Sequence, residues 1–258
     1  MAGGTMIVVG AGRVGTAFAR RAEARALPVT LVDREQGWEA LDAAPGTPIL
    51  LTVRAEDLRE VVAKVPDHRR EDLVLCQNGA IRELISELGL HFITRAVLYV
   101  MAPGRDQDVT AAMRSPVTGR HAWAVASWLE AIGLPAQQMH QVRFGAYELE
   151  KLLWLAANGP LCEAHGCTVG EVVREYREEL DHLVTELIPA GRAAWGIDPD
   201  PPWVVERCVS WSEHIPDYRA SVKEWPYRNG WIRGVAAEWN LEMPMHEELL
   251  QQLGHVRR

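Results

Sequence analysis

The sequence predicts an α/β protein in which a doubly wound, mostly parallel sheet is followed by an all-α domain. A glycine-rich turn of the form GxGxxG occupies residues 10–15, directly after a short apolar run at 6–9. Apolar runs and helical periods alternate up to about residue 143, a pattern typical of a doubly wound sheet. Helical periods dominate from there on, so the predicted domains are 1–143 and 144–258.

The glycine-rich turn belongs to a strand–turn–helix–strand unit. A second apolar run at 29–32 is closed by Asp33, 18 residues after Gly15. In dinucleotide-binding sites the first glycine makes the turn, the second admits the pyrophosphate and the third lets helix and strand pack. An ordinary glycine turn is the alternative, but all parts occur in order, which indicates a Rossmann domain that binds NAD(P). The expected cofactor-binding residues of the turn are Gly10, Ala11, Gly12, Arg13, Val14 and Gly15.

Composition excludes several classes of protein. The net charge of −8 argues against a nucleic-acid or anionic-membrane partner. No apolar run approaches the roughly 20 residues that span a bilayer, and the N-terminus lacks signal-peptide features, so a cytoplasmic protein is expected. Cys162, His165 and Cys167 are residue types that bind metals, but no second cluster completes a site, so no metal is expected.

The remaining elements follow from periodicity and from Gly and Pro breaks. Further strands are expected at 48–54, 72–76 and 92–101, with helices at 55–65, 81–88 and 121–134. The segment 102–119 is expected to be loop with a short strand. Helices of the second domain are expected at 144–157, 161–165, 169–195, 202–212 and 226–239. Because ligands bind beyond the carboxyl ends of parallel strands, a helical domain docked there would cover the nicotinamide.

Three side chains are candidates for catalysis. Asn78 follows a predicted buried strand and would face the cofactor crevice, although Asn-Gly is also a plain turn signal. Lys151 lies among apolar residues of a helix, where burial would lower its pKa and let it protonate a carbonyl. The alternative is an exposed lysine paired with Glu148. Glu224 lies just before a helix expected to start at Pro226, and it could serve only that helix start.

In this order the motifs resemble the ketopantoate reductase (2-dehydropantoate 2-reductase) family over nearly the whole chain. The last matching segment is similar to the family's TEIDYING block. The matching segments are GAGRVG at 10–15, VRAEDL at 53–58, QNG at 77–79, EKLLWLAANGPL at 150–161 and KEWPYRNGWIRGVAAEWNLEMP at 223–244.

The resemblance implies a reductase that transfers hydride from the nicotinamide to the carbonyl carbon of a 2-oxo acid such as 2-dehydropantoate. Lys151 would be the general acid that protonates the carbonyl oxygen. Glu224 would hold the substrate hydroxyl, and Asn78 would lie beside the nicotinamide. Ser212, 12 residues before Glu224, matches the substrate-contacting serine of the family.

The chain departs from the family at substrate-binding positions. The family's asparagines four and eight residues after its lysine are replaced by Leu155 and Gly159, with an asparagine displaced to Asn158. Leucine makes no hydrogen bond, so a site for a polyhydroxy acid would lose recognition. A more apolar keto acid or an imine, in a pocket lined by tryptophans, is therefore an alternative substrate. A non-catalytic NADP-binding sensor is the alternative from another class.

The resemblance also bears on the cofactor. Family members use NADPH, and Arg34 stands where an arginine commonly meets the 2′-phosphate, while Arg54 replaces the usual lysine near the cofactor. Asp33 favours the ribose hydroxyls of NAD instead. NADPH is the expected cofactor, with NADH as the alternative. The expected partner is a small-molecule carbonyl substrate, and a homodimer is left open.

Overall fold

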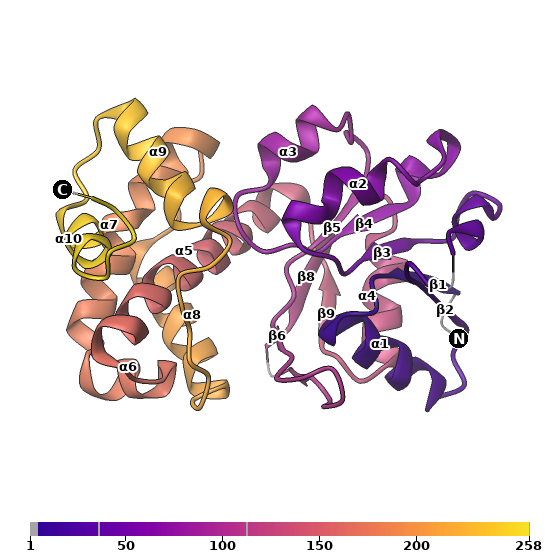
Figure 1. The fold of residues 1–258 in the computed structure, drawn as a ribbon, viewed down its shortest axis with the longest axis horizontal. Coiled ribbons are helices and arrows are strands. Elements are labelled where there is room, and N and C mark those ends of the chain that lie inside the picture. Colours follow the sequence, from indigo (N-terminus) through magenta and orange to yellow (C-terminus); the bar gives the residue numbers. More distant parts are fainter. Residues whose placement is uncertain (1–4, 36, 112, 258) are drawn as a thin grey trace. The chain divides into compact units, whose positions relative to one another are not determined.

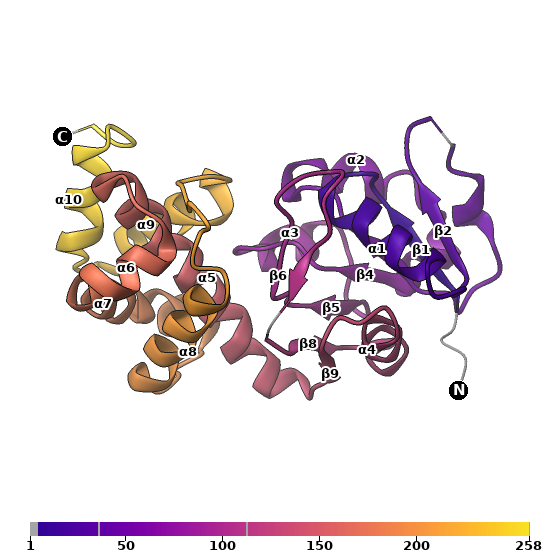
Figure 2. The same ribbon diagram turned by 90° about the horizontal axis from the view of Figure 1, so that it is seen from below.

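A computed structural model describes residues 5–35, 37–111 and 113–257 of the chain, which divides into two compact units, Met1–Phe144 and Gly145–Arg258. The first unit contains a sheet with helices on both faces, and the second is helical (Figures 1 and 2). The predicted fold class, a mostly parallel sheet followed by an all-α region, is confirmed.

The described residues of the first unit form a seven-stranded sheet in the order β2-β1-β3-β4-β5-β8-β9. All neighbouring strands are parallel except β5 and β8. The strands are β1 (Met6–Val9), β2 (Val29–Val32), β3 (Ile49–Leu51), β4 (Leu73–Leu75), β5 (Thr94–Ala96), β8 (Ser115–Thr118) and β9 (Ala136–Gln138). The short run 136–138 was not predicted as a strand. The run 92–101 was predicted as one strand, which is wrong: it contains β5 and, in a separate two-stranded ladder with β7 (Thr110–Ala111), β6 (Val100–Met101).

Helices and short turns connect the strands of this sheet. They are α1 (Arg13–Glu23), α2 (Leu58–Val62), α3 (Arg82–Glu87) and α4 (Ala122–Ala131), with short 3₁₀ turns at η1 (Glu39–Asp42), η2 (Ala55–Asp57) and η3 (Asp67–Asp72). Helices α1 and α4 share one face of the sheet, where Phe18 and Trp128 meet edge to face at 6.2 Å between ring centroids. Short aliphatic strands buried on both sides explain why the sequence shows continuous apolar runs here instead of alternation.

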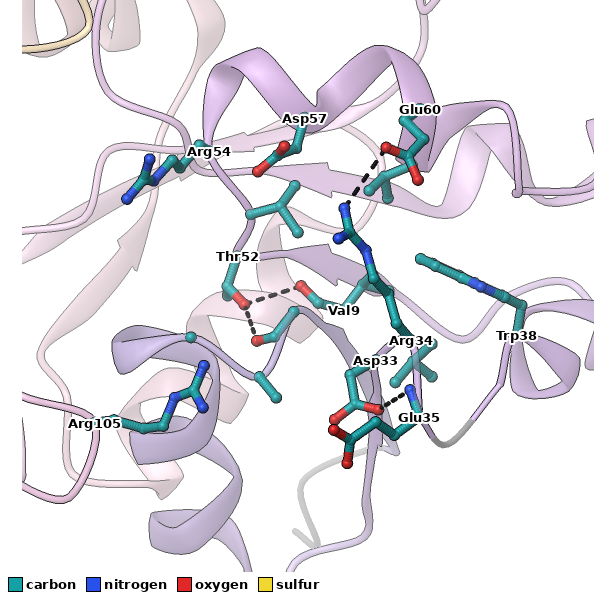
Figure 3. Close-up of a pocket in the computed structure, with 16 residues that line it drawn as sticks. Val9, Asp33, Arg34, Glu35, Trp38, Thr52, Arg54, Asp57, Glu60 and Arg105 are labelled. Carbon is teal, nitrogen blue, oxygen red and sulfur yellow. Dashed lines mark hydrogen bonds and ion pairs between the residues drawn. The ribbon is translucent and has the colours of Figure 1, made fainter.

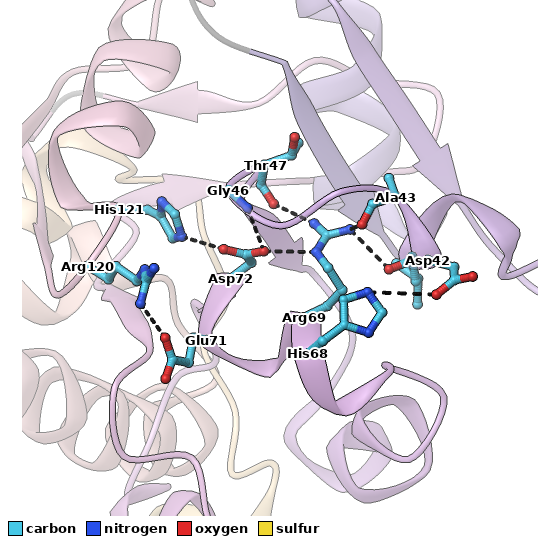
Figure 4. A network of polar contacts seen from close by, with 11 residues as sticks. Asp42, Ala43, Gly46, Thr47, His68, Arg69, Glu71, Asp72, Arg120 and His121 are labelled. Carbon is cyan, nitrogen blue, oxygen red and sulfur yellow. Dashed lines mark hydrogen bonds and ion pairs between the residues drawn. The ribbon is translucent and has the colours of Figure 1, made fainter.

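The segment between η1 and β3 is held by a buried guanidinium (Figure 4). Arg69 is fully buried and donates to Oδ2 of Asp72 at 2.8 Å. The other acceptors of its guanidinium are carbonyl oxygens at 2.7–3.0 Å, those of Leu41, Ala43 and Thr47. Asp72 also accepts from the backbone N–H of Gly46 and lies 2.8 Å from Nε2 of His121. A buried charge is tolerated here because it is paired and its donors are satisfied.

The second unit is built from helices that pack mainly through aliphatic side chains and tryptophans. Their bounds are α5 (Gln141–His165), α6 (Val169–Glu175), α7 (Arg177–Trp195), α8 (Pro201–His214), η4 (Trp225–Tyr227), α9 (Asn229–Trp239) and α10 (Pro244–Gln252). Helix α6 begins with a capping box between Thr168 and Glu171. Helix α8 is capped by Asp200, whose side chain accepts from the N–H of Trp203.

Helix α5 runs unbroken through Pro160, so the predicted break between separate helices at 144–157 and 161–165 is wrong. Proline lacks the N–H that would bond the carbonyl four residues earlier, which here is that of Ala156. The side-chain amide of Asn229, at the start of α9, donates to this carbonyl at 2.8 Å. A partner distant in sequence therefore replaces the missing helical hydrogen bond, and periodicity along α5 alone could not reveal it.

Candidate functional site

The glycine turn between β1 and α1 has the geometry that a pyrophosphate requires. Gly10 has φ of +107°, a conformation that favours glycine. A Cβ on Gly15 would lie 2.0 Å from the carbonyl oxygen of Gly10, so only glycine allows α1 to start so close to β1. A Cβ on Gly12 would meet no protein atom within 4 Å, because Gly12 faces open space.

The N-terminus of α1 is available for an anion. Gly12 is its N-cap and provides no side-chain cap, and the first turn contains no acidic residue. The backbone N–H groups and the helix dipole there favour negative charge. Arg13, Val14 and Gly15 form this first turn. The sequence prediction did not include Thr52, at the end of β3, whose Oγ1 lies 2.9 Å from the carbonyl oxygens of both Val9 and Gly10 and fixes the turn.

A pocket of about 550 Å³ opens beside the turn (Figure 3). It lies at the carboxyl ends of β1, β2 and β3, as expected for a nucleotide in such a sheet. The predicted cofactor residues that line it are Gly10, Ala11, Gly12, Asp33, Arg34 and Arg54. Trp38, Glu60 and Arg105 also line it and were not predicted, because no local motif links these positions to the turn.

The rim of this pocket carries opposed charges. Nη2 of Arg34 lies 3.6 Å from Oε2 of Glu60 on α2, and both side chains are largely exposed. Asp33 accepts a hydrogen bond from the backbone N–H of Glu35 at 2.9 Å. Together these features fit a nicotinamide dinucleotide. The glycine turn and the helix terminus suit the pyrophosphate, Asp33 suits ribose hydroxyls and Arg34 suits a phosphate.

Asn78 is half-buried in the turn that follows β4. The preceding Gln77 donates from its side-chain amide to the carbonyl oxygens of Leu51 and Val53 at 2.7 and 3.0 Å. Gly79 then takes a positive φ of +93°. The turn is thereby tied to the end of β3, and Asn78 has a fixed position at the carboxyl edge of the sheet.

In the helical unit, Lys151 is buried on α5, with 5% of its surface exposed. Its Nζ lies 4.7 Å from the ring centroid of Trp154 and 4.4 Å from that of Trp211 on α8. Burial lowers the pKa of Lys151 to about 7, against the opposing effect of Glu150. The prediction of a desolvated ammonium thus agrees with its place in the structure, whereas an exposed lysine does not.

Two arginines lie around this lysine, each paired with a glutamate. Nε of Arg207 lies 3.3 Å from Oε2 of Glu150, which is fully buried. Arg228, only 8% exposed, pairs with Glu224, and its charge also lowers the pKa of Lys151. Glu224 has φ of +46°, an unfavourable conformation for a residue with a Cβ. Arg228 therefore connects Glu224 electrostatically with Lys151, and it was missed because the resemblance offers no counterpart.

Ser212 and Asn158 are both fully buried. The hydroxyl of Ser212 accepts from Nε1 of Trp154 at 2.9 Å and donates to the carbonyl of Cys208 at 3.0 Å. The amide of Asn158 donates to the carbonyl of Trp154 at 3.1 Å. At Gly159, an added Cβ would lie 3.1 Å from the backbone of Ser221, so an asparagine there would require this backbone to shift by a few tenths of an ångström.

Comparison with solved structures identifies the fold as that of the ketopantoate reductases. A 2-dehydropantoate 2-reductase from Geobacter metallireducens is 15% identical, with TM-score 0.75 over 97% of this chain and 99% of that chain. A ketopantoate reductase from Staphylococcus aureus, described as dimeric, is 16% identical, with TM-score 0.68 over 97% and 98% of the two chains. A D-mandelate dehydrogenase solved with NADH and anilino(oxo)acetate is 16% identical, with TM-score 0.74 over 97% and 98%.

No family model matches the sequence, and neither does any curated protein. The likeness to solved structures therefore establishes the fold, and activity has to be argued from the residues. Within the described ranges, no helix is long and apolar enough to cross a membrane. Nor do these ranges contain a group of three or more His, Cys, Asp or Glu side chains placed to hold a metal ion.

Proposed function

We propose that this chain is an NADPH-dependent reductase of the ketopantoate reductase type, acting on 2-oxo acids such as 2-dehydropantoate. The observation that carries the proposal is a buried lysine, whose burial lowers its pKa to about 7, in a chain whose other unit has a pocket beside the glycine turn. A general acid works best when its pKa lies near the working pH, because it is then both protonated and ready to give up its proton.

The reaction needs a hydride and a proton. The reduced nicotinamide, when bound, supplies the hydride to the carbonyl carbon. Lys151 gives its Nζ proton to the carbonyl oxygen, which becomes the hydroxyl of the product, and the lysine is left neutral. Glu224 would hold the substrate hydroxyl, and Asn78 would lie beside the nicotinamide, as the resemblance implies. A positively charged Arg228, buried beside this acid and lysine, suits the carboxylate of a 2-oxo acid.

NADPH is favoured by Arg34, whose guanidinium fork matches a phosphate, with Arg54 and Arg105 adding positive charge around the same pocket. Asp33 and Glu60 oppose a 2′-phosphate. The ratio of kcat/KM for NADPH to that for NADH tests this part directly. A clear preference for NADH would contradict it.

Removal of the lysine is the sharpest test of the reaction. Lys151→Ala should lower kcat roughly 100- to 10,000-fold, the usual effect of losing a general acid. NADPH binding, followed by cofactor fluorescence, should survive. Lys223→Ala, at an exposed position of the same unit, is the control and should leave kcat unchanged. Unchanged turnover in Lys151→Ala would refute the assignment.

A more apolar substrate is the second candidate. Trp154 and Trp211 flank the lysine, and Leu155 stands where the resemblance leads one to expect an asparagine. The D-mandelate dehydrogenase of the same fold was solved with an aromatic oxo acid. A panel of aliphatic and aromatic 2-oxo acids, each with its ketone lacking the carboxylate, separates the candidates. We expect turnover only of the acids. Tight cofactor binding without any turnover would favour the sensor.

A further inference from the structure

Two tryptophans from different helices face the same ammonium group. Lys151 and Trp154 lie one helical turn apart on α5, and Trp211 comes from α8. Nζ is 4.7 and 4.4 Å from the two ring centroids, within the range of cation–π attraction. The rings are mutually edge to face, with centroids 6.3 Å apart, so each can present its face to the cation without stacking on the other.

The orientation of one ring is set by a hydrogen bond. Nε1 of Trp154 donates to Oγ of Ser212 at 2.9 Å, and Ser212 donates in turn to the carbonyl of Cys208 at 3.0 Å. A hydroxyl has one proton to donate, and this one is committed to the helix backbone. Ser212 is fully buried, so its contacts serve Trp154 and the backbone of α8.

The rings and burial have opposite effects on the pKa of Lys151. Taking the ammonium out of water disfavours its charged form, whereas a ring face stabilises a cation. The other titratable groups that act on Nζ are Glu150 on the same helix, Arg207 and Cys208 on α8, and Arg228 before α9. The two rings differ from these groups. Their faces surround the ammonium, and they favour its charged form without adding an anion.

We propose that Trp154 and Trp211 form an aromatic clamp that holds the Lys151 ammonium, and that Ser212 is a positioning residue that orients Trp154 and does not bind the substrate. The consequence for catalysis rests on the proposed function, but the clamp itself does not. The clamp assigns to the two aromatic faces a part in positioning the lysine.

The clamp can be tested without turnover, because the chain has only three lysines, at 64, 151 and 223. Selective ¹³C,¹⁵N-lysine labelling gives three side-chain NMR signals, assigned with Lys64→Arg and Lys223→Arg. Titration then yields the pKa of Lys151 directly. Trp211→Leu keeps the site apolar and removes a ring, so the pKa should fall by about half to one unit. In Trp211→Phe, which keeps a smaller ring, the pKa of Lys151 should fall less.

The control is Trp231→Leu, in the same unit, where Trp231 packs on Trp195 at 4.9 Å between centroids. It should leave the Lys151 titration unchanged. A pKa that stays constant or rises in Trp211→Leu overturns the clamp. If that variant fails to fold, Trp211→Phe decides by the same criterion.

Ser212→Ala tests the positioning role. The Ser212→Ala variant should shift the pKa of Lys151 and change kcat, while KM for the 2-oxo acid stays unchanged. A tenfold rise in KM with an unmoved lysine titration would mean that Ser212 binds substrate after all. If the alkaline limb of the kcat profile follows the NMR shifts across these variants, the lysine is the general acid. If only the NMR signal shifts, the clamp stands and the proposed function fails.

Discussion

The two candidate sites are built in opposite ways. The pocket beside the glycine turn is shaped by backbone, and the side chains on its rim, such as Arg34 and Glu60, are largely exposed. The surroundings of Lys151 are shaped by buried side chains from several helices. Water screens the first set of charges and is excluded from the second. Geometry should therefore dominate mutational effects in the pocket, and electrostatics should dominate those around the lysine.

The largest contrast should appear in stability. Lys151 has a folded-state pKa near 7 and an ordinary value of 10.5 when unfolded. Between these values the unfolded chain binds a proton that the folded chain does not, so the lysine's contribution to stability improves as pH rises. Lys151→Met should therefore be more stable than the wild type at pH 7, by about 2–5 kcal/mol. This advantage should shrink towards pH 10.

Denaturant unfolding at pH 7, 8.5 and 10 measures this difference. The exposed Lys223→Met is the matched control and should show no such trend. A constant difference between Lys151→Met and wild type across this range would mean that Lys151 is not desolvated in the folded protein.

A pair of glycine substitutions sharpens the geometric side of the comparison. Gly12→Ala meets no protein atom, so the melting temperature should hardly change, while NADPH affinity should fall about 100-fold because the methyl group occupies the pyrophosphate position. Gly15→Ala clashes with the carbonyl of Gly10 and should lower both stability and affinity. Thermal melts and fluorescence titration distinguish the two. A stable Gly12→Ala variant with full affinity would exclude the proposed pyrophosphate site.

The smallest effect is expected at the pocket rim. Glu60→Gln removes the ion pair with Arg34 and leaves the guanidinium free for a phosphate. Exposed pairs contribute at most about 1 kcal/mol, so the NADPH-to-NADH ratio of kcat/KM should rise about two- to fivefold. Asp57→Asn, in the same pocket, removes a like charge without touching this pair and should change the ratio less. An unchanged ratio in Glu60→Gln would mean that Glu60 does not compete with the 2′-phosphate for the Arg34 guanidinium.

Local sequence was sufficient wherever one short segment determines the structure. The glycine turn, β1 to β4 and the change to helices near residue 144 were all predictable from periodicity and glycine spacing. Contacts between residues distant in sequence could not be predicted in this way. The continuity of α5 depends on Asn229, 73 residues beyond Ala156, and the second ring beside Lys151 comes from Trp211, 60 residues further along. No periodicity encodes such pairs.

The contacts of Arg69 limit how many residues the stretch 41–47 can contain. Surface segments without regular structure usually tolerate inserted residues, since longer loops cost little entropy. The stretch 41–47 is different, because its carbonyl oxygens converge on one buried guanidinium with a fixed reach. One inserted residue would move an acceptor away and leave a buried donor unpaired. Among related sequences this stretch is expected to vary in side chains and to keep a constant number of residues wherever the arginine is kept.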